Sequence, residues 1–181
     1  MADWGQVELC LSPYAHPIVP LLLDMESARE AMPEVHLPVN PVYPGGQERA
    51  RWHLAKGRET FKRVFGREAT GLWPSEGGVS QASLELFAES GFRWVASGGS
   101  VLNNSHDGHS TSCSHRVYRF GNAGINCVFR DDGLSDLIGF NYSDWHAEDA
   151  VANLVGHMEH IAELCPDRED CLITIILDGE N

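Results

Sequence analysis

The segment Cys171-Leu-Ile-Thr-Ile-Ile-Leu177 is apolar and rich in β-branched residues, and it leads directly into Asp178-Gly-Glu-Asn181. Such a run predicts a buried β-strand, because β-branched side chains pack well on a pleated surface. In parallel α/β enzymes the residues that follow the carboxyl ends of the strands carry the chemistry. The segment therefore favours a mainly parallel α/β fold in which Asp178 is a candidate catalytic acid. A strand of this kind rarely ends a complete domain, so we expect the chain to be a piece of one.

Working outward from this segment, runs with strand character alternate with runs of helical spacing. Apolar residues recur at helical spacing over 47–65, where Gly66 ends the pattern, and a second helix is expected between an N-cap at Ser80 and Gly91. A third is expected after a cap at Ser143 or Asp144. The expected strands are 7–11, 70–73, 92–96, 115–120, 125–129 and 171–177, with a loop over 98–114. This alternation predicts a parallel sheet whose loops after the strands hold the site.

Composition limits the possible partners. The 181 residues include 13 Lys or Arg against 26 Asp or Glu, a formal net charge of −13. Phosphate recognition needs a basic surface, so the charge argues against nucleic acid and anionic membranes and suits a neutral substrate. The N-terminus does not read as a signal peptide, and no apolar run is long enough to span a bilayer.

The five cysteines are odd in number and have no paired spacing, which favours a reducing, cytoplasmic setting. Cys10 and Cys171 lie in strand-like runs, where cysteine usually acts as a small buried hydrophobe. A cluster of His106, His109, Cys113 and His115 matches no standard zinc spacing, and we expect it to be a polar loop without metal.

Three segments place polar groups just after expected strands: 12–17, 71–80 and 177–181. Glu76 lies between Pro74-Ser75 and Gly77-Gly78, where the backbone must bend, and Trp73 beside it offers an aromatic face for a sugar ring. Glu76 and Asp178 together can form the carboxylate pair of glycoside chemistry. Taken singly, an exposed Glu is more often a solvated surface residue, and an Asp after a strand is often a helix cap.

Together the segments resemble glycoside hydrolase family 57, whose members act on α-glucans such as starch and glycogen. Ser12-Pro-Tyr-Ala-His-Pro-Ile-Val-Pro-Leu-Leu22 is similar to one conserved region of that family, and Gly71-Leu-Trp-Pro-Ser-Glu-Gly-Gly-Val-Ser80 is similar to the region of the nucleophile. Leu177-Asp-Gly-Glu-Asn181 resembles the region of the proton donor. Phe129-Arg-Asp-Asp-Gly-Leu-Ser-Asp-Leu-Ile-Gly-Phe140 also resembles a stretch of the family. The resemblance covers nearly the whole chain in the family's order.

The resemblance implies an incomplete (β/α)7 barrel and a retaining two-step mechanism without a cofactor. Glu76 would be the nucleophile and Asp178 the proton donor, separated by roughly 5–5.5 Å as in other retaining pairs. The family's opening His-Gln-Pro motif is absent from these residues. We therefore expect 1–181 to be part of a single catalytic barrel domain that lacks its first strand and its C-terminal region, and to have little activity by itself.

Four further residues are candidate substrate-binding groups. His16 can line the sugar pocket, as the resemblance suggests, or be a buried structural histidine. Arg130 and Asp131 can hydrogen-bond sugar hydroxyls or orient the carboxylates, although capping is an equal alternative for Asp131. Trp73 can stack on a sugar ring or pack in the core.

The α-glucan hypothesis covers both an amylase-type hydrolase and a 4-α-glucanotransferase, which differ in whether water or a sugar hydroxyl completes the second step. Two alternatives stay open. One is a metal-dependent polysaccharide deacetylase of related barrel fold, and the other is a carbohydrate-binding remnant without catalysis.

Overall fold

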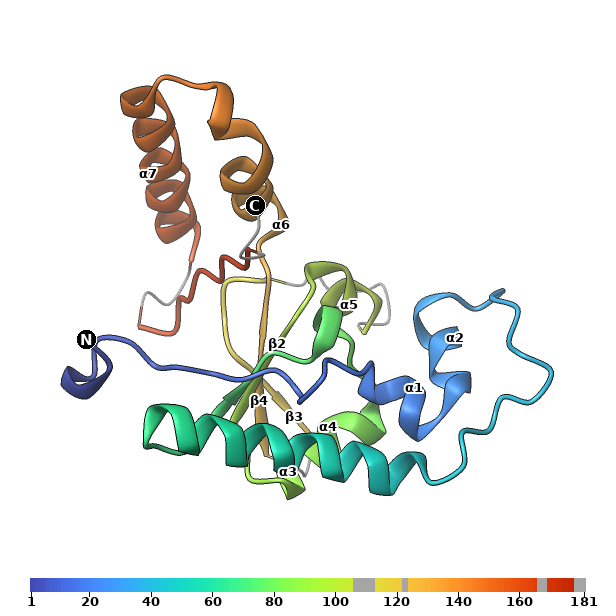
Figure 1. Ribbon diagram of the computed structural model, residues 1–181. Helices are drawn as coiled ribbons and strands as arrows, with labels where there is room; N and C mark the ends of the chain where they lie inside the picture. Colours follow the sequence, from blue (N-terminus) through green and yellow to red (C-terminus); the bar gives the residue numbers. More distant parts are fainter. Residues whose placement is uncertain (106–112, 122–123, 166–168, 178–181) are drawn as a thin grey trace. The chain divides into compact units, whose positions relative to one another are not determined.

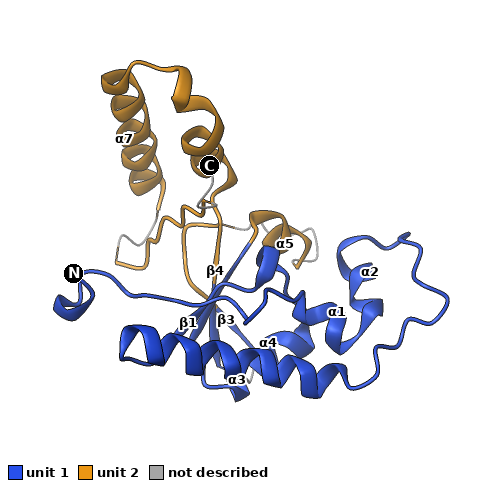
Figure 2. Cartoon of the chain, viewed as in Figure 1, with its two compact units in different colours: residues 1–97, 119–127 blue, residues 98–118, 128–181 orange. Residues whose placement is uncertain are grey.

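The computed structural model describes residues 1–105, 113–121, 124–165 and 169–177 (Figure 1). The chain divides into two compact units (Figure 2). Unit 1 comprises Met1–Ser97 and Arg119–Cys127, and unit 2 comprises Gly98–Tyr118 and Val128–Asn181. Asp178 falls outside the described residues.

The sheet follows the order β1-β2-β4-β3, formed by β1 (Gly71–Leu72), β2 (Trp94–Ser97), β3 (Tyr118–Phe120) and β4 (Ile125–Phe129). β1 pairs in parallel with β2, so that Leu72 lies opposite Val95, and both side chains are fully buried. On the other side of β1, Leu11 forms a parallel bridge with Leu72. The predicted α/β fold with mainly parallel strands is confirmed, although the strand expected over 7–11 is reduced to this single bridge.

Two helices of unit 1 form where local sequence signals predict them. α3 (Gly46–Phe65) buries Ala50, Leu54 and Phe61 on one face and ends at Gly66, whose φ of 68° is left-handed. α4 (Gln81–Glu89) begins with a capping box between Ser80 and Ser83 and buries Leu84, Leu86 and Phe87. α1 (Val19–Leu23) packs against both, and α2 (Ala28–Ala31) follows it (Figure 1). Short 3-10 turns at Ala2–Trp4, Met25–Ser27 and Ser75–Gly77 complete the unit.

Gly71 of β1 has no room for a side chain of its own. A Cβ built there would lie 2.1 Å from the Trp94 ring. The indole cannot move away freely, because its Nε1 donates to Glu8 Oε1 at 2.9 Å. Hydrogen bonds from Thr70 and Trp94 lower the pKa of Glu8, so its carboxylate stays a charged acceptor near neutral pH.

We expect Gly71→Ala to lower the free energy of unfolding by about 1–3 kcal/mol, because it overpacks the contact with Trp94. Gly156→Ala is the matched control, since a Cβ at Gly156 meets nothing within 4 Å. In the middle of a helix that substitution should stabilise by about 0.5–1 kcal/mol. Urea unfolding measures both, and an equal response of the two variants would contradict the packing argument.

Unit 2 contains α5 (Gly99–Asn104), α6 (Asp132–Asp136), a π-helical turn (Leu137–Asn141), a 3-10 turn (Tyr142–Asp144) and α7 (Ala147–Leu164). The loop expected over 98–114 is therefore wrong at its start, where Gly98 caps α5 and Leu102 is buried. The expected cap at Ser143 or Asp144 is also wrong. Both residues lie within the 3-10 turn, and the N-cap of α7 is His146, whose backbone is extended.

The strand predicted over 171–177 is not formed. Its backbone groups instead bond to non-strand partners of unit 2: Leu172 N–H donates to His115 O, Asp131 N–H donates to Thr174 O, and Ile176 N–H donates to Ser135 Oγ, at 2.9, 2.8 and 3.2 Å. A ladder needs a neighbouring strand whose groups repeat in register, and these partners do not supply one. Leu172 and Leu177 are exposed, so the segment is not the buried strand that its composition predicts. Among the described helices, none is long and apolar enough to cross a membrane.

Candidate functional site

Glu76 is held in an unusual backbone conformation. It has φ 57° and ψ 21°, in the left-handed region that a residue with a Cβ seldom adopts. The turn around it is fixed by Gly77 N–H to Pro74 O at 2.8 Å and by Ser97 Oγ–H to Gly77 O at 2.6 Å. The Glu76 side chain remains 77% exposed. The backbone is thus anchored to β2 while the side chain is free to meet a ligand.

His16 lies next to Glu76. Its Nδ1 is 4.0 Å from Glu76 Oε1, and half of its side chain is exposed, so it is not the buried structural histidine of the alternative interpretation. The described non-glycine residues with positive φ are Ala15, His16 and Glu76. All three lie in segments 12–17 and 71–80, the two polar segments of unit 1 that follow expected strands. Strained backbone of this kind persists only where the surrounding structure enforces it, and it clusters at functional sites.

Aromatic side chains accompany the same segments. Trp73 is half-buried, and its backbone N–H donates to Leu11 O at 2.9 Å. Tyr14 meets Trp52 of α3 edge-on, with 5.7 Å between ring centroids, and both residues are exposed. His53 Nδ1 bonds to Tyr14 O at 2.6 Å, which ties this part of α3 to the His16 segment. The sequence prediction missed Trp52; the available signal was its place outside the buried stripe of α3.

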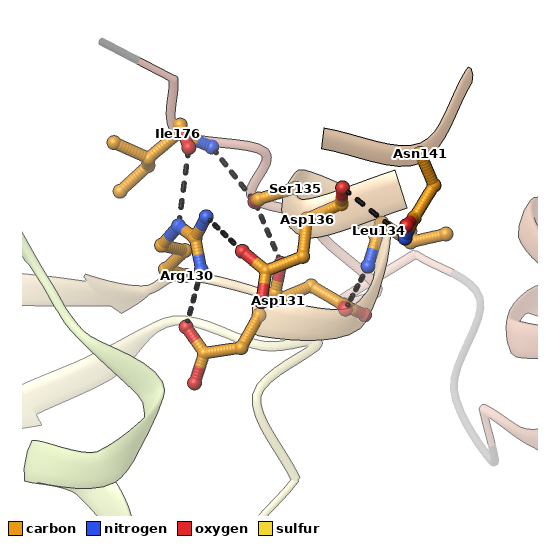
Figure 3. A network of polar contacts seen from close by, with 8 residues as sticks. Arg130, Asp131, Leu134, Ser135, Asp136, Asn141 and Ile176 are labelled. Atoms are coloured by element: carbon orange, nitrogen blue, oxygen red, sulfur yellow. Dashed lines mark hydrogen bonds and ion pairs between the residues drawn. The ribbon is translucent and has the colours of Figure 1, made fainter. Parts of the chain in front are cut away.

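In unit 2, Arg130 is the centre of a polar network (Figure 3). Its Nη1 donates to Asp132 Oδ1 at 2.8 Å, its Nη2 to Asp136 Oδ1 at 2.7 Å, and its Nε to the backbone O of Ile176 at 3.1 Å. Partial burial favours the neutral guanidine, but the hydrogen bonds to the two carboxylates raise the pKa of Arg130 above its usual value. Arg130 is therefore a permanent cation that bonds to the segment leading to Asp178.

Asp131 has the capping role that was one of its two alternatives. Its Oδ1 accepts from Leu134 N–H at 2.8 Å at the start of α6, and its Oδ2 lies 2.7 Å from His115 Nε2. Its backbone C=O accepts from Ser135 Oγ–H at 2.6 Å. Asp131 N–H donates to Thr174 O, and Ser135 Oγ accepts from Ile176 N–H. Figure 3 shows Ser135 and Arg130 meeting Ile176, so this cluster and Arg130 hold the segment before Asp178.

A metal site is not evident in the described part of the chain, where no group of three or more His, Cys, Asp or Glu side chains is arranged to bind an ion. Cys113 and His115 of the cluster noted in the sequence are described, and His115 is engaged with Asp131. His106 and His109 lie outside the described residues.

The chain matches a known protein family over its full length. The sequence model of Glycosyl hydrolase family 57 matches residues 1–181. None of the functionally curated proteins matches the chain.

Among solved structures, a GH57 branching enzyme from Thermococcus kodakaraensis is 14% identical with a TM-score of 0.70; the match covers 99% of this chain and 41% of that one. A GH57-type branching enzyme from Pyrococcus horikoshii is 14% identical with a TM-score of 0.67; the match covers 99% of this chain and 39% of that one. A 4-α-glucanotransferase from Thermococcus litoralis is 17% identical with a TM-score of 0.62; the match covers 99% of this chain and 23% of that one. These likenesses show the fold, and they are consistent with an incomplete (β/α)7 barrel. The chain spans less than half of each of these proteins.

Proposed function

The chain belongs to glycosyl hydrolase family 57, and from this premise we propose that it is the part of an α-glucan-active enzyme that carries the nucleophile and the proton donor. The observation that supports the proposal most directly is the conformation of Glu76. The motif that resembles the family's nucleophile region places an exposed carboxylate on an anchored, left-handed backbone, 4.0 Å from His16. An ordinary solvated surface glutamate needs none of these features.

In the proposed mechanism Glu76 attacks the anomeric carbon while Asp178 protonates the leaving oxygen, which gives a covalent glycosyl-enzyme. Asp178 then acts as the base for the second step, in which water or a sugar hydroxyl is the acceptor. Branching enzymes and a glucanotransferase are among the structural neighbours, so transfer to a sugar is included in the proposal. His16, Trp73 and the Tyr14–Trp52 pair are proposed to contact the glucan.

Arg130 and Asp131 remain proposed substrate-binding groups, and their contacts add a second role. Because Arg130 Nε bonds to Ile176 O two residues before Asp178, we propose that Arg130 also positions the donor. We also propose that residues 1–181 are part of one catalytic barrel domain and that the protein is cytoplasmic.

The function is tested with the protein that carries these residues, incubated with amylose and with maltooligosaccharides. Release of reducing ends identifies hydrolysis, and redistribution of chain lengths without new reducing ends identifies transfer. Release of acetate from an acetylated polysaccharide, lost on chelation, would establish the deacetylase alternative instead. Binding of maltooligosaccharide without turnover would leave the non-catalytic remnant as the remaining account.

We expect Arg130→Lys to lower kcat by about 10- to 100-fold with little change in KM, because small displacements of a catalytic group are costly. Lysine keeps the charge but loses the planar fork that binds Asp132, Asp136 and Ile176 O together. Hydrogen exchange at 172–177 should become faster. Arg116→Lys, at an exposed arginine of the same unit, is the control. A raised KM with unchanged kcat would show that Arg130 binds sugar rather than positions the donor.

A further inference from the structure

Cys165 and Cys171 lie side by side in unit 2, although their spacing in the sequence suggests no pairing. Cys165 is the C-cap that follows α7, and its backbone N–H donates to Ile161 O at 3.0 Å. Cys171 is the first residue of the segment that precedes Asp178. The two Sγ atoms are 2.7 Å apart and both residues are half-buried. The two thiols are therefore in direct contact and close enough to be joined, although the separation is longer than the ~2.05 Å of a disulfide bond.

The other cysteines have different surroundings. Cys10 and Cys113 are exposed. Cys127 is buried, and burial raises the pKa of its thiol to about 11, so it is a poor nucleophile at neutral pH. The pairing of Cys165 with Cys171 is therefore a specific feature of this part of the chain and not a general accumulation of thiols. Cys10, for its part, is not the buried hydrophobe that its strand-like run predicts.

We propose that Cys165 and Cys171 are a redox-sensitive pair that forms a reversible disulfide, which ties the end of α7 to the segment leading to Asp178. The segment is already bonded to Asp131, Ser135 and Arg130 through its middle and its far end. The disulfide adds a covalent attachment at its first residue. Oxidation therefore restricts the motion of 171–177, and reduction releases its start.

The oxidant is a small-molecule disulfide such as oxidised glutathione. One cysteine thiolate attacks a glutathione sulfur, forms a mixed disulfide and expels one glutathione thiolate. The second cysteine thiolate then attacks the protein sulfur of that mixed disulfide and expels the other glutathione. The two protons lost by the cysteines are taken up by the two glutathione thiolates, so two thiols and one glutathione disulfide give one protein disulfide and two glutathiones. The contact with Cys171 raises the pKa of the Cys165 thiol, so exchange is faster in mildly alkaline solution.

The test treats the reduced protein with oxidised glutathione, alkylates the remaining thiols and maps the peptides by mass spectrometry. We expect a product lighter by two hydrogen atoms with Cys165 linked to Cys171, and full reversal by dithiothreitol. Cys113→Ser should form the same product, whereas Cys165→Ser and Cys171→Ser should not. In the protein without substitutions, hydrogen exchange over 172–176 should be slower after oxidation than before it.

Two results would overturn the proposal. One is alkylation of both Cys165 and Cys171 after oxidation, or a disulfide of either with Cys10 or Cys113. The other is a Cys165–Cys171 disulfide that leaves hydrogen exchange over 172–176 unchanged, which would refute the tether. Neither measurement depends on turnover, so the outcome is separate from the proposed glucan activity.

Discussion

Replacing Glu76 with glutamine is expected to lower kcat on α-glucans by about four to six orders of magnitude, as removal of a covalent nucleophile does in other enzymes. Glutamine keeps the size and hydrogen-bonding shape of the side chain but cannot attack the anomeric carbon. Because the Glu76 side chain is 77% exposed, the change should leave the fold and substrate binding nearly unaltered. Initial rates on maltooligosaccharides and a binding isotherm with the same sugars measure the two effects separately.

Glu85→Gln is the matched control, because Glu85 is an exposed glutamate on α4, nine positions along the chain. It should retain full activity. Trapping the covalent intermediate with a slow fluorinated substrate should label Glu76. A label on another carboxylate, or an active Glu76→Gln variant, would reject Glu76 as the nucleophile.

Replacing Asp178 with asparagine is expected to lower kcat on natural glucans by about 10²- to 10⁴-fold, the usual contribution of general acid–base catalysis. A donor acts in its protonated form, so activity that depends on it falls as pH rises through its pKa. Asparagine cannot titrate, and the alkaline limb of the pH profile should disappear. An aryl maltoside with a good leaving group needs no proton in the first step and should lose much less activity.

Azide should restore turnover of the Asp178→Asn variant on the aryl maltoside, because an anionic nucleophile needs no base to resolve the glycosyl-enzyme. Asp170→Asn, at an exposed aspartate of the same unit, should behave as the unaltered protein. If natural and activated substrates are affected equally by Asp178→Asn, Asp178 is not the donor.

The sequence predicted the helices best where the deciding signals are local. The stripe of Ala50, Leu54 and Phe61 and the stop at Gly66 lie within one element, and so does the Ser80 capping box. Strand formation depends on a partner, and for this reason the apolar run over 171–177 was predicted wrongly. Its backbone groups bond to His115, Asp131 and Ser135, which are far away in the sequence.

The candidate site was predictable in its residue types but not in its geometry. A glutamate between proline and two glycines predicts a bent loop. Residue type does not predict that Glu76 itself takes the left-handed conformation, because glycine normally occupies such positions. The bond from Arg130 to Ile176 O joins residues 46 positions apart and has no local signature at all.

The positive φ of Glu76 has a consequence for protein engineering. A residue with a Cβ in this conformation is less favourable than glycine by about 1–2 kcal/mol, and asparagine also tolerates it well. A screen that selects only for heat resistance will therefore favour Gly or Asn at position 76, and under the proposed mechanism those variants will be inactive. Stability and turnover compete at this position, so a library built for thermal tolerance should keep Glu76 fixed.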